Sequence, residues 1–205
     1  MEKVDFKKQL KALYQPSAKT FAIVDVPKMQ FFKVDGMGDP NVSEEYGLCV
    51  QWLYSIAYPL KFWAKKELGK DHVVPPLEGL WWADDMNAFI KGDRGAWKWT
   101  MMVMAPDWVT QEAFVEARDA AVKKVGGEPP ASLRLETFDE GLSVQIMHLG
   151  PYSAEAPTIA KLHSEFLPAN GLVENGHHHE IYLNDPRRVA PEKLKTVLRQ
   201  PVRSV

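Results

Sequence analysis

The segment His177-His178-His179-Glu180-Ile181-Tyr182-Leu183-Asn184-Asp185-Pro186 has the pattern of a strand that runs into an Asn-Asp-Pro turn. Alternation along a strand places Ile181 and Leu183 on one face, which can bury against helices. The other face carries His178, Glu180 and Tyr182. Strands disfavour glutamate, and a buried glutamate needs a partner or titrates abnormally. Glu180 is therefore either a solvated strand residue or the anionic floor of a pocket.

The composition is that of a soluble globular protein. The 205 residues are 45% hydrophobic and 25% charged, and the net charge of -2 at pH 7 gives no electrostatic reason to expect a nucleic-acid partner. The N-terminus lacks the apolar core of a signal peptide, and no run approaches the ~20 apolar residues of a membrane span. We expect a cytoplasmic protein without a membrane partner, present as a monomer or weak homodimer.

Large, adaptable apolar side chains are abundant, with seven Trp, nine Phe, six Tyr and eight Met. Most large aromatic side chains in any protein belong to its core. Broad ligand pockets also use aromatic and Met side chains, so the composition favours a small aromatic molecule as the partner.

Turn residues and hydrophobic spacing predict the order of the elements. A strand over residues 20–34, broken at Pro27, precedes a helix that Ser43 caps and that ends near Gly69. Two further helices are expected over residues 110–125 and 154–166. The remaining strands are expected over residues 77–83, 96–104, 133–138, 142–149 and 193–202, with 133–138 and 142–149 paired as a hairpin.

The order of strand, turn, helix and two strands occurs twice. Pro129-Pro130 marks a boundary between repeat halves of about residues 19–128 and 129–203, and residues 1–18 form a lead-in. The sequence therefore predicts an α+β fold of duplicated antiparallel βαββ units. A pseudo-two-fold axis would relate the two units, and a central ligand cleft would lie between their uncovered faces.

The repeat supplies a counterpart for the segment around Glu180. At an offset of 100, Leu80-Trp81-Trp82-Ala83-Asp84-Asp85 corresponds to residues 180–185. Alternation then places Leu80 and Trp82 on the face equivalent to that of Glu180 and Tyr182, and it turns Trp81 toward a helix. Trp82 across from Tyr182 and Glu180 would form an aromatic box with an acid in it.

Other side chains are candidates for contact with the ligand. Trp97, Trp99 and Met101 share one face of the strand over residues 96–104, but the sequence does not say which face of that strand meets the cleft. Tyr152 follows the Gly150-Pro151 turn, where a helix starts at the rim of the cleft.

The run of three histidines raises the question of a metal site. His177 and His179 share a face, and His178 could join Glu180, but no third protein ligand stands at a helpful spacing. We therefore expect no metal and no other cofactor, and we keep His178 as a ligand contact.

Two segments resemble a known family. They are residues 178–188, His-His-Glu-Ile-Tyr-Leu-Asn-Asp-Pro-Arg-Arg, and residues 194–202, Leu-Lys-Thr-Val-Leu-Arg-Gln-Pro-Val. Together with the duplicated layout they resemble the GyrI-like small-molecule-binding proteins, over roughly residues 20–203. The Lys11-Ala12-Leu13-Tyr14 lead resembles stand-alone members of that family.

The resemblance implies a function as well as a fold. Drug-binding members hold planar aromatic compounds, often cationic ones, above a glutamate that maps to Glu180. Some stand-alone members, the cyclopropanoid cyclopropyl hydrolases, hydrolyse cyclopropane-bearing DNA-alkylating natural products with an aromatic cage. The resemblance therefore implies binding of xenobiotics and a role in resistance to them, and it leaves open whether this chain also turns its ligand over.

Glu180 has two chemical uses in this setting. A carboxylate in a ring-lined cleft attracts a delocalised cation, or it orients a water molecule for attack on a strained carbon. For the second use, Tyr182 or Tyr152 would supply a proton to the developing phenolate. The alternative from another class is a non-catalytic effector-type or protein-interaction module, which predicts a closed cleft and a large exposed apolar patch.

Overall fold

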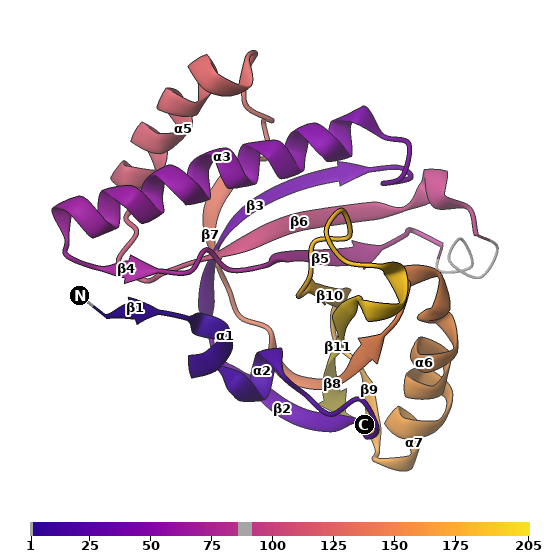
Figure 1. Cartoon of the computed structure of the whole chain (residues 1–205). Helices are drawn as coiled ribbons and strands as arrows, with labels where there is room; N and C mark the ends of the chain where they lie inside the picture. The colour runs from indigo at the N-terminus through magenta and orange to yellow at the C-terminus, as the bar shows by residue number, and fades with distance from the viewer. Residues whose placement is uncertain (1, 86–91) are drawn as a thin grey trace. The chain divides into compact units, whose positions relative to one another are not determined.

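The structure is a computed structural model that describes residues 2–85 and 92–205 (Figure 1). Its strands are β1 (Lys3–Val4), β2 (Ala22–Val26), β3 (Met29–Met37), β4 (Asp71–His72), β5 (Leu77–Trp82), β6 (Lys98–Ala105), β7 (Arg134–Phe138), β8 (Gly141–Leu149), β9 (Leu172–Glu174), β10 (His178–Tyr182) and β11 (Lys195–Ser204). Its α-helices are α1 (Phe6–Gln9), α2 (Lys11–Tyr14), α3 (Glu44–Glu67), α5 (Gln111–Val125), α6 (Ala156–Lys161) and α7 (Leu167–Ala169). Short helical turns are η1 (Arg94–Ala96), η2 (Tyr152–Ala154), η3 (Leu162–Phe166, a π-helical turn) and η4 (Pro191–Lys193).

The chain divides into two compact units. Unit 1 consists of Met1–Phe6, Met29–Pro75 and Gly79–Phe138. Unit 2 consists of Lys7–Lys28, Pro76–Glu78 and Asp139–Val205. The division after Phe138 lies ten residues beyond the predicted one, and the second half of the predicted lead-in packs into unit 2, where Leu13 and Tyr14 are buried.

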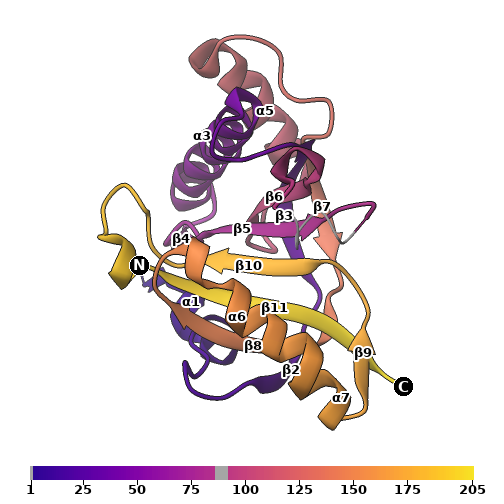
Figure 2. The same cartoon turned by 90° about the vertical axis from the view of Figure 1, so that its right-hand side faces the viewer.

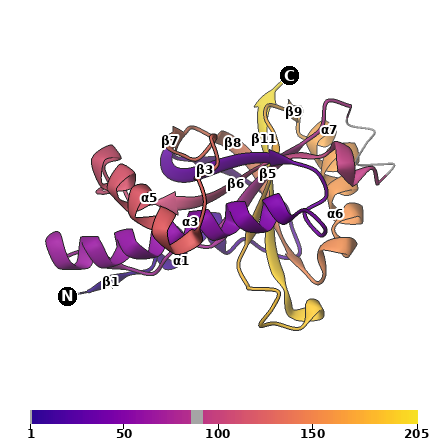
Figure 3. The same cartoon turned by 90° about the horizontal axis from the view of Figure 1, so that it is seen from above.

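Unit 1 packs two helices on an antiparallel sheet. Its strands follow the order β5-β6-β3-β7, and α3 and α5 lie next to each other, as Figure 3 shows. The predicted cap of α3 is confirmed, because the Ser43 hydroxyl accepts a hydrogen bond of 3.2 Å from the Tyr46 N–H. Phe32 of β3 stacks on Phe114 of α5, which joins the sheet to its helix layer.

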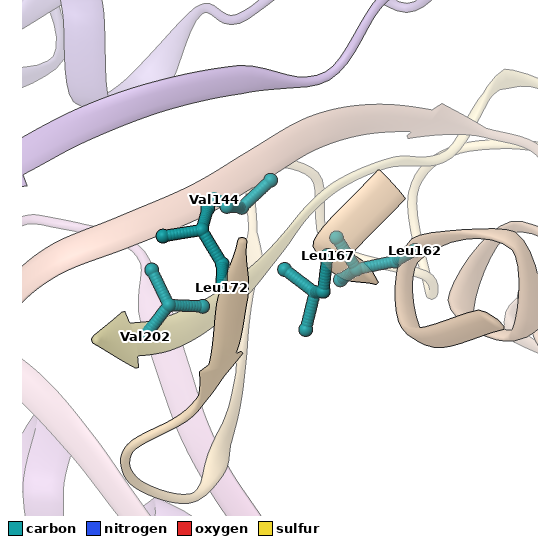
Figure 4. Close-up of a cluster of buried hydrophobic side chains, with 5 residues drawn as sticks. All are labelled: Val144, Leu162, Leu167, Leu172 and Val202. Atoms are coloured by element: carbon teal, nitrogen blue, oxygen red, sulfur yellow. The ribbon is translucent and has the colours of Figure 1, made fainter. Parts of the chain in front are cut away.

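Unit 2 has the strand order β2-β8-β11-β10, and β9 pairs with the end of β11. The helical segment α6-η3-α7 crosses one face of this sheet, as Figure 2 shows. Figure 4 shows the hydrophobic cluster that fixes it there, in which side chains from the helix meet side chains from the strands. The cluster consists of Val144, Leu162, Leu167, Leu172 and Val202, with Phe21 and Phe166 packed against it.

The two units share one strand pairing. In unit 1 the strand before α3, β3, pairs with β6, and in unit 2 the strand before α6, β8, pairs with β11 in the same antiparallel way. Unit 1 continues after β6 with α5 and β7. This antiparallel α+β architecture is the predicted fold class. The origin of the two units by duplication stays a prediction.

Two details of the predicted strands differ in the structure. Pro27 separates two strands, β2 and β3, in place of one interrupted strand. The predicted hairpin of residues 133–138 and 142–149 is wrong, because β7 pairs with β3 and β8 pairs with β2 and β11. Side chains favour the β7–β3 pairing, since Lys33 forms an ion pair of 2.9 Å with Glu136 and Arg134 one of 2.9 Å with Asp35. Within residues 2–85 and 92–205, no helix is long and apolar enough to cross a membrane.

Candidate functional site

Glu180 and Tyr182 lie on the face of the unit 2 sheet that the helical segment covers. Glu180 pairs across the strands with Leu198, and Leu198 pairs with Ile146, so these side chains share a face with Val144 of the hydrophobic cluster. Both residues are half-buried. The predicted alternation along β10 is confirmed, because Ile181 is fully buried on the opposite face. The prediction that the Glu180 face is left uncovered by helices is wrong, because the helical segment packs on that face.

The Glu180 carboxylate has defined neighbours on its own strand. The Tyr182 hydroxyl donates a hydrogen bond of 2.8 Å to Oε2 of Glu180. Nε2 of His178 lies 3.6 Å from Oε1, a distance that allows an ion pair when the histidine is protonated. The ring of Tyr152 meets the ring of Tyr182 edge to face, with centroids 5.5 Å apart. The structure thus brings together four residues that the sequence analysis selected.

A second carboxyl group, which the sequence analysis missed, belongs to the same place. Glu155 precedes α6, and only 4% of its surface is exposed. Its Oε1 accepts no hydrogen bond from any residue that the structure describes. The Thr196 hydroxyl, which shares the face of Tyr182, lies nearby without completing a hydrogen bond. We call Glu155, Glu180, Tyr152 and Tyr182 the acid cluster.

Burial and like charge set the protonation of this cluster. Burial, and then the negative charge of Glu180, raise the pKa of Glu155 from 4.5 to about 9, against a smaller opposing effect of Thr196. Burial and the charges of Glu155, Glu180 and Asp185 raise the pKa of Tyr152 to about 12. Glu155 is therefore a neutral carboxylic acid at pH 7. The cluster combines this proton donor with a carboxylate that holds one tyrosine hydroxyl.

The aromatic candidates of unit 1 form a separate cluster. Trp99 is fully buried and meets Tyr46 of α3 edge to face at 5.2 Å, so this face of β6 meets α3. A Cβ atom at Gly36 would overlap the Trp99 ring, so this glycine makes room for it. Trp81 stacks on Tyr46 and meets Trp97 at 5.9 Å.

The other predicted contacts in unit 1 occupy different positions. Met101 is fully buried on the Trp99 face, and Leu80 is buried as well. Trp82 is half-buried on the opposite face of β5 from Trp81. In unit 1 the helix side of the sheet carries Trp81, whereas in unit 2 it carries Glu180 and Tyr182. The predicted offset of 100 therefore pairs Glu180 and Tyr182 with residues on the other side of the unit 1 sheet, the side away from its helices.

The opposite face of β10 holds a second set of charged groups. His179 is completely buried between two carboxyl groups, with Nδ1 2.8 Å from Glu140 Oε1 and Nε2 3.0 Å from Glu78 Oε2. Arg199, its cross-strand neighbour, donates to Glu140 at 2.9 Å. We call Glu78, Glu140, His179 and Arg199 the buried ion quartet.

Further donors and acceptors complete the quartet. Arg199 also donates to the Leu13 carbonyl at 2.9 Å and to the Gln145 side chain at 3.0 Å, and the Tyr14 hydroxyl donates to Glu78 at 2.9 Å. Burial opposes a charge on His179, but Glu140 and Glu78 outweigh it and raise the pKa of its imidazole. A protonated His179 donates from both ring nitrogens, so two positive charges balance two negative ones.

The histidine run does not gather into a metal site. Within residues 2–85 and 92–205, no group of three or more His, Cys, Asp and Glu side chains could hold a metal ion. Both ring nitrogens of His179 are engaged with carboxyl groups, which leaves no lone pair for a metal.

Comparison with known proteins identifies the family of the chain. A model of the GyrI-like small molecule binding domain matches residues 19–203. The chain belongs to the GyrI-like family, as its sequence motifs predicted. A search of curated proteins found no match.

Solved structures of two Listeria innocua proteins are similar over their whole length. An uncharacterized conserved protein is 45% identical, with 98% of this chain and 100% of that chain covered and a TM-score of 0.89. A protein described as a hydrolase is 43% identical with the same coverage and a TM-score of 0.87. The C-terminal domain of EcmrR shares the fold at 11% identity, with a TM-score of 0.57 over 91% of this chain and 98% of that chain.

Proposed function

We propose that the protein binds planar aromatic compounds, including cationic ones, at the acid cluster and thereby protects the cell from xenobiotics. The observation that carries this proposal is the half-buried Glu180 carboxylate, which accepts a hydrogen bond from Tyr182, whose ring meets that of Tyr152 edge to face. Neither Glu180 nor Glu155 forms an ion pair with a lysine or arginine among the described residues. The negative charge of the cluster is thus available to a ligand.

The physical gain for such a ligand comes from two sources. A delocalised cation gains Coulomb attraction to Glu180, which partial burial strengthens relative to water. The edge-to-face tyrosines add cation–π contacts of roughly 0.5–2 kcal/mol each. Tyr152 is 39% exposed, so one side of the cluster is open to an incoming molecule.

Fluorescence titration with rhodamine 6G, a permanently cationic planar dye, tests this function. Replacing Glu180→Gln removes the charge and keeps the shape, and we expect affinity to fall about tenfold, or ~1.4 kcal/mol. Glu165→Gln is the control, because it removes an exposed carboxylate of the same unit that lies outside the acid cluster, in η3. Equal affinity in the Glu180 variant and the control would contradict the role of the carboxylate.

A second function, hydrolysis of cyclopropane-bearing alkylating compounds, has its own support. A protein 43% identical over the whole chain is described as a hydrolase. The acid cluster also holds a neutral carboxylic acid beside a carboxylate, an arrangement suited to general acid–base catalysis. We propose that a substrate with a cyclopropane conjugated to a dienone is hydrated there.

The proposed step adds one water molecule to the substrate. Glu180 takes a proton from water while the water oxygen bonds to a cyclopropane carbon and the strained C–C bond breaks. The electron pair passes through the dienone to its oxygen, which takes a proton from Glu155 or from a tyrosine hydroxyl. The proton on Glu180 then passes, through solvent, to the group that protonated the dienone oxygen. This restores the starting protonation of the cluster.

Detection of the ring-opened product by mass spectrometry tests the second function. Product should form faster with the protein than in buffer, and replacing Glu180→Gln or Tyr182→Phe should slow its formation. Formation no faster than in buffer would leave binding as the whole function.

A further inference from the structure

We propose that an organic cation entering the acid cluster displaces the proton of Glu155, so that binding of the cation releases one proton to solvent. This inference rests on the proposed binding function and adds a property to it. The cluster would take up the cation in exchange for a proton, whereas a neutral aromatic ligand would leave the proton in place.

The geometry of Glu155 carries the inference. The side chain is 4% exposed, and its Oε1 accepts no hydrogen bond from the described residues, so an ionised Glu155 would lack a compensating partner. Glu180 is close enough to raise the pKa of Glu155 by its charge. The proton on Glu155 is what allows both carboxyl groups to stay in this small space.

The neighbours of Glu155 come from every element around it. Glu180 of β10, Thr196 of β11 and Tyr152 of η2 act on Glu155 or are acted on by it. One step further out, His178 and Tyr182 lie beside Glu180, His148 of β8 pairs with Thr196, and Asp185 acts on Tyr152. His178 is the other group of this set that could give up a proton to an incoming cation, because its Nε2 lies 3.6 Å from Glu180. The experiment must therefore separate Glu155 from His178.

Charge balance explains why the cation replaces the proton. Before binding, the proton on Glu155 leaves the two carboxyl groups with one negative charge between them. With a cation between them and both ionised, the sum is again one negative charge. The ligand thus supplies the positive charge that the proton supplied, and it adds contacts with the tyrosine rings.

Isothermal titration calorimetry with rhodamine 6G measures the released proton directly. Titrations near neutral pH in phosphate and in Tris, whose ionisation enthalpies differ, give the number of protons from the difference in observed heat. We expect close to one proton per dye, and an affinity that rises with pH by up to about tenfold per unit below the pKa of Glu155. Nile red, an uncharged dye, should show neither effect.

Variants assign the proton to its source. Glu155→Gln should abolish both the proton release and the rise of affinity with pH, whereas His178→Gln and the control Glu165→Gln should retain them. Binding of the dye without proton release, or loss of the release in His178→Gln alone, would overturn this inference and leave the proposed function intact. Absence of any dye binding would overturn both.

Discussion

The two faces of β10 hold charged groups in opposite ways. On one face the buried ion quartet pairs two carboxylates with His179 and Arg199, and every one of these side chains is buried. On the other face the acid cluster sets two carboxyl groups side by side, and Oε1 of Glu155 accepts no hydrogen bond from the described residues. His179 and Glu180 are neighbours in sequence, but His179 belongs to a network of balanced charges and Glu180 belongs to a cluster of acids.

With the proposed function, the two faces give one strand a role in stability and a role in binding. A buried ionic network is stabilising when its charges cancel and its hydrogen bonds are complete, as in the quartet. A cluster with uncompensated charge is held in place by its surroundings and lowers the stability of the fold. A ligand that supplies the missing positive charge stabilises such a cluster. We therefore assign the quartet to the fold and the acid cluster to function.

The largest effect should come from removing the charge of His179. His179→Met leaves Glu78 and Glu140 buried without their shared partner, and we expect the free energy of unfolding to fall by about 3–5 kcal/mol. Urea-induced unfolding followed by tryptophan fluorescence measures this change. Glu155→Gln is the control from the other face and should cost less than about 1 kcal/mol, because a neutral amide replaces a carboxyl group that is already neutral at pH 7. Equal losses in the free energy of unfolding for the two variants would contradict the assignment of different roles to the two faces.

The pH dependence of stability should also differ in sign between the faces. Glu155 has a folded-state pKa of about 9, raised from 4.5, so the stability that its proton contributes is complete below pH 4.5 and is lost as the pH rises toward 9. Glu155→Gln lacks this loss. Between about pH 6 and about pH 8 its stability should rise relative to the natural protein by up to ~3 kcal/mol.

Glu140 should show the reverse behaviour. Burial opposes its ionisation, but His179 and Arg199 outweigh burial and hold the pKa of Glu140 at about 2, below its ordinary 4.5. Its stabilising contribution is present above pH 4.5 and is lost as the pH falls through 2. The deficit of Glu140→Gln should therefore shrink in acid. Urea unfolding across this pH range measures both variants, and parallel pH profiles would contradict the contrast.

The sequence predicts local features of this molecule well. The alternation along β10, the Ser43 cap of α3 and the family all follow from short patterns, because each depends on residues close together in the chain. Glu155 could not be found in this way. A glutamate at the start of a helix has the ordinary pattern of a charge that favours the helix dipole, and its burial depends on β10 and β11.

The errors concern long-range partners. The bonds from Glu78 to Tyr14 and His179 span 64 and 101 residues, and no local pattern specifies them. β7 was expected to pair with its neighbour β8, but it pairs with β3 instead. The choice of Trp82 as a ligand contact stays a prediction, and it depends on an offset between repeats that no local pattern fixes, since a shift of one residue reverses the face of every side chain on a strand.

The same substitution can be made on both faces, because each carboxylate accepts a hydrogen bond from a tyrosine. Tyr14→Phe removes the donor to the fully buried Glu78, and we expect a loss of about 2 kcal/mol in the free energy of unfolding. Tyr182→Phe removes the donor to the half-buried Glu180, where water can replace it, so the expected loss is under about 1 kcal/mol. Rhodamine 6G affinity should change in the second variant alone, since Tyr182 lies in the acid cluster. A larger loss in the free energy of unfolding for Tyr182→Phe than for Tyr14→Phe would mean that the face of the acid cluster, too, serves stability.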